Sequence, residues 1–236
     1  MDGARLGAPA VPLGRPRHGR LRLLPARRPH RRGRDAEPSG AGPAVLERVL
    51  PDADATAKAV ERANGSVLLS PMDVADEGRM AILADRAGVP FGVWEPRGIK
   101  GLDVVTAPGA LSWLELHTPD LPAAAGFFNA VFGWETTAID MAGGSHTCVG
   151  PAGTEPSALF GGIVPLDRGP GETASGPHWL AYFEVPDPDA VVTRARELGG
   201  SVLAPATDLA GAGRFARLAD PYGARFAVIR SEQPQD

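Results

Sequence analysis

The sequence predicts an α+β fold built from paired βαβββ modules, and an internal repeat is the main reason. Residues 51–93 and 186–228 align without a gap at a fixed offset of 135 positions, and 19 of these 43 positions are identical. Chance gives roughly 3 or 4 identities over such a length, so the chain arose by duplication. The second observation is the order of local patterns, in which single helices alternate with runs of short strands.

The first copy of the repeat predicts one βαβββ module followed by a linker. Its helix pattern has acidic residues in the first turn and ends at Asn64 and Gly65. A turn at 85–88 joins the last two strands as a hairpin, and Pro and Gly recur from 96 to 109. The predicted elements are strands at 45–50, 66–69, 78–83 and 90–94 and a helix at 52–63.

Two further modules are predicted after residue 111. The helix of the first has an apolar stripe that includes Leu121, Ala124 and Phe128, and Gly133 ends it. The helix of the second is closed by Gly199 and Gly200. The predicted elements are strands at 112–117, 146–149, 157–163, 178–185, 201–203, 214–218 and 224–229, helices at 121–132 and 189–198, and a loop at 165–176.

Residues 1–44 have a different composition from the rest of the chain. They contain ten arginines and a net charge of +7, while the whole chain carries −4. Seven prolines and seven glycines leave no apolar pattern that offsets chain entropy, so this segment predicts a disordered tail. No apolar region follows its arginine pairs, as an export signal requires, and no aromatic residues alternate with the arginines, as nucleic-acid binding favours.

The chain has a single cysteine, Cys148, which predicts a cytoplasmic protein with no disulfide. It also lacks a long apolar run, which predicts no membrane partner. Only Lys58 and Lys100 are lysines in an arginine- and alanine-rich chain, a usage that indicates a bacterial source. The composition therefore argues against nucleic acid and membrane partners.

Three segments give the chain a resemblance to a known family. They are 113–120 (WLELHTPD), the helix end at 132–134 (FGW) and 213–226 (GRFARLADPYGARF). These resemble the vicinal oxygen chelate superfamily, which includes glyoxalases, extradiol dioxygenases and bleomycin-resistance proteins. The resemblance implies that paired modules form a curved mixed sheet, shaped as a cup around the site.

The resemblance is closest to tandem two-domain members, in which four modules form two domains. This chain shows three modules, and the arginine-rich segment stands where the first is expected. We therefore interpret 1–44 as an out-of-frame or wrongly started translation of a lost first module. The predicted organisation is a tail at 1–44, an orphan second half-module at 45–96, a linker at 97–110, a complete domain at 111–231 and a tail at 232–236.

The resemblance also implies where a divalent metal is bound in catalytic relatives, on the first and last strands of each module. In this sequence those positions fall at Trp113, near Leu180, at 160–162 and at Ala227, and none carries a metal ligand. His117, His178, Glu115 and Glu184 offer an unconventional alternative, but a two-residue shift moves a ligand by about 6 to 7 Å. We predict no metal and no other cofactor.

Alternation along two strands identifies the candidate ligand-binding residues. Trp113, Glu115 and His117 share one face, as do His178, Leu180, Tyr182 and Glu184 on the other strand. Glu115 and Glu184 are weak catalytic candidates, since each is either a hydrogen-bonded strand residue or a carboxylate whose pKa is raised in an apolar cup. Trp113, Trp179, Tyr182, Phe160 and Phe226 supply an aromatic lining for a pocket or an ordinary core.

Two other residue patterns have less specific interpretations. His146 and Cys148 suit a nucleophile pair, but no third, orienting group is evident. Arg79 and Arg214 recur in the repeat and suit either anion binding or an ion pair with aspartates six residues away on either side, and we favour the ion pair.

The leading functional hypothesis is a metal-free protein that binds a small, partly aromatic or amphipathic molecule. The first alternative is a metal-dependent lyase or dioxygenase of the same superfamily. The second is a truncated, non-catalytic interaction protein, because a single module leaves an open sheet edge and an uncovered apolar face. In that case residues 45–96 pair with the same segment of another chain, as a homodimer, or promote aggregation.

Overall fold

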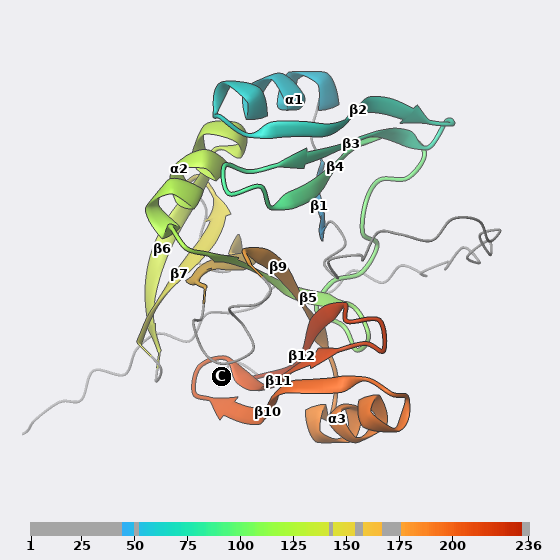
Figure 1. The fold of residues 1–236 in the computed structure, drawn as a ribbon, viewed down its shortest axis with the longest axis vertical. Helices are drawn as coiled ribbons and strands as arrows, with labels where there is room; N and C mark the ends of the chain where they lie inside the picture. The colour runs from blue at the N-terminus through green and yellow to red at the C-terminus, as the bar shows by residue number, and fades with distance from the viewer. Residues whose placement is uncertain (1–43, 50–51, 142–143, 154–157, 167–175, 233–236) are drawn as a thin grey trace, which may run out of the picture.

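Two β-sheets and three helices make up the described part of the molecule (Figure 1). The computed structural model describes residues 44–49, 52–141, 144–153, 158–166 and 176–232. The predicted tail at 1–44 therefore lies outside these residues except for Ala44, as do most of the predicted loop at 165–176 and most of the tail at 232–236. No helix in the described part is both long and apolar enough to cross a membrane.

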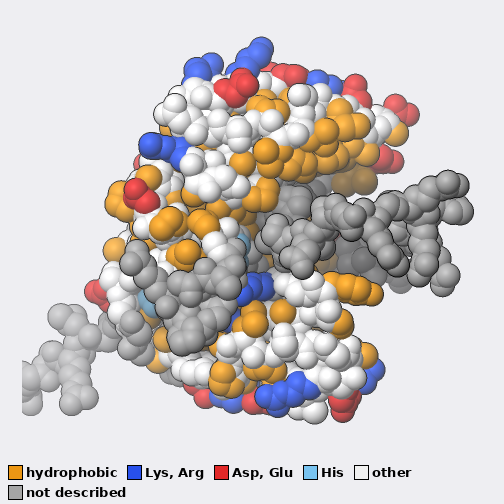
Figure 2. Space-filling view, in the orientation of Figure 1, with side chains coloured by type: hydrophobic (Ala, Val, Ile, Leu, Met, Phe, Trp, Pro, Cys, Tyr) orange, Lys and Arg blue, Asp and Glu red, His pale blue; other side chains and the backbone are white. Residues whose placement is uncertain are grey.

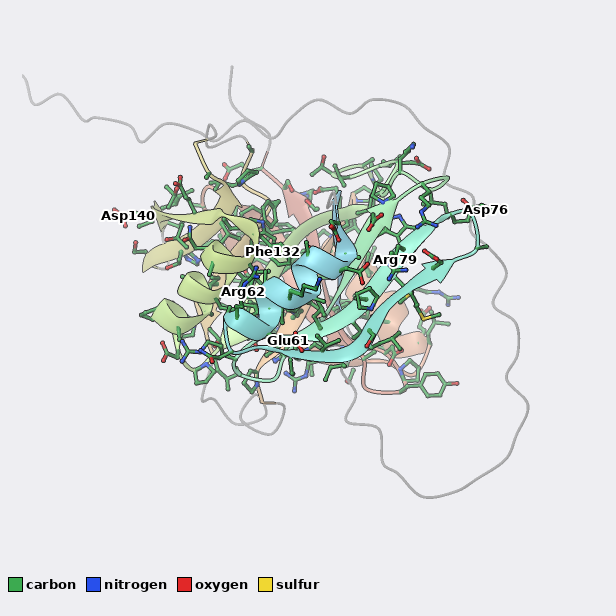
Figure 3. All side chains as sticks on the ribbon, turned by 90° about the horizontal axis from the view of Figure 1, so that it is seen from above. Glu61, Arg62, Asp76, Arg79, Phe132 and Asp140 are labelled. Atoms are coloured by element: carbon green, nitrogen blue, oxygen red, sulfur yellow. The ribbon has the colours of Figure 1, made fainter. Side chains whose placement is uncertain are left out.

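The first sheet comes from residues 44–96. The strand order is β1-β4-β3-β2, with β1 parallel to β4 and the other pairs antiparallel. Asp52 caps the helix by accepting a 2.8 Å hydrogen bond from the backbone N–H of Ala55, and the helix lies across β2 and β3 (Figure 3). The elements are β1 (Ala44–Val49), α1 (Ala53–Arg62), β2 (Ser66–Val74), β3 (Gly78–Ala84) and β4 (Pro90–Pro96).

The second sheet combines two βαβββ modules. The first is β5 (Leu111–Thr118), α2 (Leu121–Phe132), β6 (Trp134–Met141), β7 (Gly144–Pro151) and β8 (Gly161–Pro165). The second is β9 (His178–Glu184), α3 (Pro188–Glu197), β10 (Ser201–Leu209), β11 (Gly213–Ala219) and β12 (Arg225–Ser231).

The eight strands of this sheet lie in the order β10-β11-β12-β9-β5-β8-β7-β6. The first strands of the two modules, β5 and β9, are antiparallel at the centre. Each is also parallel to the last strand of its own module, β8 or β12. This arrangement confirms the predicted α+β fold with paired βαβββ modules in a mixed sheet.

The sequence patterns missed one strand and shortened several others, most of all β2 and β10. β6 was not predicted, because it is an edge strand whose residues are mostly exposed and lack apolar alternation. β2 and β10 each extend beyond the predicted 66–69 and 201–203, since register shifts within both strands interrupt the alternation that sequence patterns rely on.

The repeated arginines form structural ion pairs, as favoured from the sequence. Arg79 donates through Nε and Nη2 to the two carboxylate oxygens of Asp54 at 2.9 and 3.1 Å, and through Nη1 to Asp73 at 3.2 Å. Figure 3 shows Arg79 beside α1, which carries Asp54. The strand β3 is thereby tied to the start of the helix. The second copy has the same contacts, from Arg214 to Asp189 at 2.6 and 2.9 Å and to Asp208 at 2.7 Å.

The aspartates that follow these arginines by six residues stabilise the hairpin turns instead. Asp85 accepts hydrogen bonds from the backbone N–H groups of Ala87 and Val89, at 2.8 and 2.9 Å. Asp220 accepts two equivalent bonds of 2.8 Å from residues 222 and 224. The shared side-chain caps explain why both copies keep aspartate at this turn position.

One core joins the first sheet to the second. Phe91 on β4 is fully buried and packs against Phe127 and Phe128 on α2, with ring centroids 6.2 and 5.6 Å apart. The same apolar cluster continues into α1 and into the helix-covered face of the second sheet, through Val60, Leu83, Leu116 and Ile163. The half-module 45–96 is therefore packed against the C-terminal modules.

The two faces of the first sheet differ in their cover. The face toward α1 and α2 is buried, contrary to the expectation that a single module leaves its apolar face uncovered. On β2, however, Leu68, Leu69 and Met72 have exposed fractions of 58%, 41% and 47%. Figure 2 shows hydrophobic side chains gathered along the edge of this unit that faces the C-terminal modules.

Candidate functional site

The candidate site lies on the inner face of the second sheet, which we define as the face opposite to α2 and α3. Strand alternation places Leu180 and Tyr182 of β9 there, both almost fully buried, together with Ala227 of β12. Trp113 and Phe215 pack against this group. Its apolar surface surrounds a small number of polar side chains contributed by β5, β9 and β11.

Glu115 is the central polar group of the inner face. Its Oε2 accepts a 2.7 Å hydrogen bond from the hydroxyl of Tyr182 and lies 3.5 Å from Nε2 of His117. Burial raises the pKa of the Glu115 carboxyl, but the contacts from His117 and Tyr182 and the charge of Arg217 outweigh burial and lower the pKa. Glu115 is therefore a carboxylate at neutral pH, and the interpretation of a raised pKa is wrong for this residue.

Tyr182 remains a hydrogen-bond donor in this arrangement. Burial and the neighbouring carboxylate of Glu115 raise the pKa of the Tyr182 hydroxyl far above its ordinary range. The hydroxyl therefore stays protonated at any physiological pH. Its proton points to Glu115, which fixes the carboxylate on the inner face.

His117 and His178 face each other across β5 and β9. Their rings are stacked, with centroids 4.7 Å apart and planes inclined by 7°. Nδ1 of His178 lies 2.9 Å from the carbonyl of Gly176, and because a carbonyl only accepts, this nitrogen carries the proton. His117 is 2% exposed, and neither of its ring nitrogens has a hydrogen-bond partner of ordinary geometry among the described residues.

Arg217 was missed as a site residue in the sequence, whereas Cys148 and Gly162 were considered only as a nucleophile and as part of a metal position. Arg217 of β11 follows Phe215 on the same face and contributes both charge and a hydrogen bond to Tyr182. Cys148 and Gly162 lie in one row with Glu115, on the adjacent strands β7 and β8. The repeat did contain a signal for Arg217, because an arginine stands where the first copy has the apolar Ile82.

Two predicted site residues lie elsewhere. Glu184 shares the strand face with Tyr182 but is at the strand end, where its carboxylate accepts hydrogen bonds from Ser112 and from the backbone and side chain of Ser231. It is thus a hydrogen-bonded strand residue. Phe226 is wrongly predicted, because alternation along β12 turns it to the side of α3, where it packs near Val192.

The predicted aromatic lining divides in the same way. Trp113 and Tyr182 are on the inner face, whereas Trp179 packs on Phe128 of α2 and Phe160 packs on Trp134. A one-residue difference in strand position reverses the face of a side chain. Aromatic content alone therefore did not separate pocket from core.

The residues present do not fit the divalent metal of the superfamily. The positions expected to carry ligands hold Trp113, Leu180, the Phe-Gly-Gly of residues 160–162 and Ala227, none of which has a side-chain atom suited to binding such an ion. The unconventional set is not assembled either, since Glu184 is bound by serines at the strand end. Within the described ranges, no group of three His, Cys, Asp or Glu side chains is placed to hold a metal ion.

Cys148 does not suit the role of a nucleophile. Its side chain is buried, and burial together with the charge of Glu115 raises the pKa of the thiol to about 11. The reactive thiolate is therefore scarce at neutral pH. The paired role proposed for His146 and Cys148 lacks its chemical basis.

The two paired βαβββ modules and their shared mixed sheet are the architecture of a known family. A family model described as "Glyoxalase-like domain" matches residues 113–229. CFP32 of Mycobacterium tuberculosis (strain CDC 1551 / Oshkosh), whose name assigns it provisionally to the glyoxylases, is 34% identical over 186 residues, covering 78% of this chain and 68% of that protein. The chain belongs to the glyoxalase-like family of the vicinal oxygen chelate superfamily.

A second relative and a solved structure extend this comparison. The chain is 40% identical over 183 residues to the anthracycline biosynthesis protein DauV of Streptomyces sp. (strain C5), covering 75% of this chain. The matched part spans 62% of the length of that relative. Among solved structures, the 2,2',3-trihydroxybiphenyl 1,2-dioxygenase of Sphingomonas wittichii strain RW1 matches with a TM-score of 0.52 and 15% identity, covering 80% of this chain and 71% of that chain. This structural likeness shows the fold alone.

Proposed function

We propose that this protein binds a small, partly aromatic or amphipathic molecule on the inner face of the second sheet, without a resident metal. One observation carries the proposal. Glu115 is an ionised carboxylate on the inner face, beside the apolar Leu180, and its Oε2 is held by the hydroxyl of Tyr182 and lies 3.5 Å from His117. A carboxylate fixed in this way suits a ligand that offers a hydrogen-bond donor.

Several features support binding rather than metal-assisted catalysis. The four positions that hold metal in the superfamily carry no ligand atoms, and the thiol of Cys148 is protonated. A relative named for anthracycline biosynthesis is in keeping with a small organic ligand. With its single cysteine, the protein is proposed to act in the cytoplasm.

Ligand-observed NMR with a library of small aromatic and aliphatic alcohols tests this function. The protein is treated with EDTA, and we expect bound compounds whose affinity is unchanged by the chelator. Glu115→Gln should weaken them, while Glu61→Gln on the exposed side of α1 serves as the matched control. Binding or turnover that requires added Mn²⁺ or Zn²⁺ would favour the metal-dependent lyase or dioxygenase instead.

A second role, homodimer formation through residues 45–96, has one observation in its favour. β1 forms an edge of the first sheet, whereas its repeat counterpart β9 pairs on both sides. On β2, the opposite edge strand of this sheet, the exposed Leu68, Leu69 and Met72 are uncharged and suit contact with the same residues of a second copy. Light scattering of the wild type and of the Leu68→Glu, Met72→Glu variant tests the dimer. The wild type should be dimeric and the variant monomeric, and a monomeric wild type refutes the proposal.

A further inference from the structure

The strand β1 has different neighbours from its counterpart in the second copy of the repeat. That counterpart, β9, pairs with β12 on one side and with β5 on the other. Among the described strands, β1 pairs only with β4, so its other side is an open edge. The opposite edge shows no such contrast, since β2 and its counterpart β10 both end their sheets. The repeat therefore identifies β1 as the edge that lacks a neighbouring strand.

An open strand edge is a template for pairing with another chain, because its backbone donors and acceptors on that side are unpaired. Proline and lysine commonly block such pairing, and β1 contains neither in its sequence AVLERV. The edge of β1 is therefore suited to accept a further strand.

The strand that covers β9 indicates what kind of partner fits β1. β5 is the first strand of a βαβββ module and runs antiparallel to β9. The two C-terminal modules are already paired with each other through these strands. Within the described ranges, only the unit 44–96 has a first strand with an open edge, so a second copy of this unit is the matching partner.

The helix caps locate the axis of such a pairing. The aspartates that cap the three helices are Asp52, Asp120 and Asp187. The residues six positions before these caps are Leu46, Leu114 and Ala181. Leu114 and Ala181 face each other across β5 and β9, so two equivalent places meet at the centre of the C-terminal sheet. The same pairing of two β1 strands places Leu46 opposite the Leu46 of a second copy.

The charges of β1 are compatible with this register. Glu47 is then opposite Val45 of the second copy, and Arg48 is opposite Ala44. Like charges directly opposite each other would destabilise the pair, and this register has none.

β1 is attached to its own sheet as β9 is, at least at its end. Val49 is opposite Trp94 on β4, just as their counterparts Glu184 and Ile229 are opposite each other on β9 and β12. The register shifts between Val45 and Val49. A test of the axis must therefore sample several positions along β1.

The inner side of the first sheet supplies a second reason for pairing. Its residues alternate with those buried beneath the helices, and they are Leu69, Met72, Met80, Ile82 and Trp94. Leu69 and Met72 are 41% and 47% exposed. Large sheets twist and coil, so a second half-sheet joined at β1 turns an identical apolar face toward this one and removes apolar surface from water.

We infer that two copies of the chain pair along β1, antiparallel about a two-fold axis at Leu46, and form one continuous eight-stranded sheet. Its strand order is β2-β3-β4-β1 followed by β1-β4-β3-β2 of the second copy. This order has the same form as that of the C-terminal sheet, in which β9 and β5 meet at the centre. The inference rests on the homodimer proposed above and names the edge and the register that form it.

Disulfide cross-linking of the full chain tests the inference. Cys148→Ala removes the native thiol, and single cysteines then replace each of residues 44–48 in turn. Directly opposite residues of antiparallel strands have Cα atoms about 4.5 to 5.5 Å apart, within the range that a disulfide spans. After mild oxidation, Leu46→Cys should give the highest yield of cross-linked dimer. Leu198→Cys, at an exposed leucine after α3, is the matched control and should give none.

A charge at the axis provides an independent measurement. Leu46→Lys removes two apolar contacts and sets two lysines opposite each other, so it should weaken the dimer by about 10-fold or more in analytical ultracentrifugation. Leu198→Lys is the matched control and should leave the dimer unchanged. Circular dichroism shows which variants are folded, and if Leu46→Lys is not, the cysteine variants still decide.

The outcomes distinguish this inference from the homodimer on which it rests. A monomeric wild type overturns both. A dimer that cross-links at none of residues 44–48, or that cross-links through Leu68→Cys on β2 instead, overturns the pairing along β1 and leaves the homodimer standing. A maximum of cross-linking at another residue of β1 overturns the axis at Leu46.

Discussion

Replacing Phe91 by alanine tests whether the half-module 45–96 and the C-terminal modules fold as one unit. Phe91 is fully buried, and its ring lies 6.2, 5.6 and 5.9 Å from those of Phe127, Phe128 and Phe132 on α2. Its repeat counterpart, Phe226, is only partly buried and has one ring neighbour, Phe183 at 6.5 Å. The two substitutions remove the same atoms from equivalent positions with different surroundings.

The expected loss differs because the packing differs. Truncating a fully buried phenylalanine costs about 3 to 5 kcal/mol, so Phe91→Ala should lower the free energy of unfolding by about 4 kcal/mol. Phe226→Ala should cost about half as much, since part of its ring already contacts solvent. A double-mutant cycle of Phe91 and Phe128 should also show a coupling of about 0.5 to 1.5 kcal/mol from the aromatic pair.

Urea unfolding followed by circular dichroism measures these differences. A single transition with an unchanged slope is expected for the wild type and for both variants. The reasoning is refuted if Phe91→Ala costs no more than Phe226→Ala, or if Phe91 and Phe128 show no coupling. Two separate unfolding transitions would equally contradict the shared core.

Three other predictions concern the site and the turns. Tyr182→Phe removes the proton donated to Glu115 and should raise the pKa of that carboxyl, which NMR titration detects; an unchanged pKa contradicts the geometry. Because folding lowers the pKa of Glu115 below its ordinary value of 4.5, the ionised carboxylate stabilises the folded protein at pH values above 4.5. The difference in free energy of unfolding between the wild type and Glu115→Gln, measured by urea titration, should therefore shrink as the pH falls below 4.5. Asp85→Ala leaves two backbone N–H groups without an acceptor at a buried turn and should cost about 2 kcal/mol of stability. This loss should exceed that of the more exposed Asp220→Ala, and equal losses in thermal melts would count against the buried cap.

The sequence determined the features of this protein that depend on local periodicity and on repetition. The offset of 135 positions placed the turn aspartates Asp85 and Asp220 and the ion-pairing Arg79 and Arg214 in equivalent environments. The helix 121–132 was predicted with the bounds that α2 has, because its apolar stripe and the Gly133 that ends it are local signals along the chain. Such signals need only neighbours along the chain.

Only the tertiary structure decided the composition of the site and the cover of the first sheet. Glu115 meets Tyr182 across 67 residues because the backbone hydrogen bonds between β5 and β9 fix their register, and no local pattern reports that register. The same dependence turned Phe226 away from the inner face and brought Arg217 toward it. Phe91 is buried by α2, an element of another module, because an apolar face is covered by whichever surface packs on it in space.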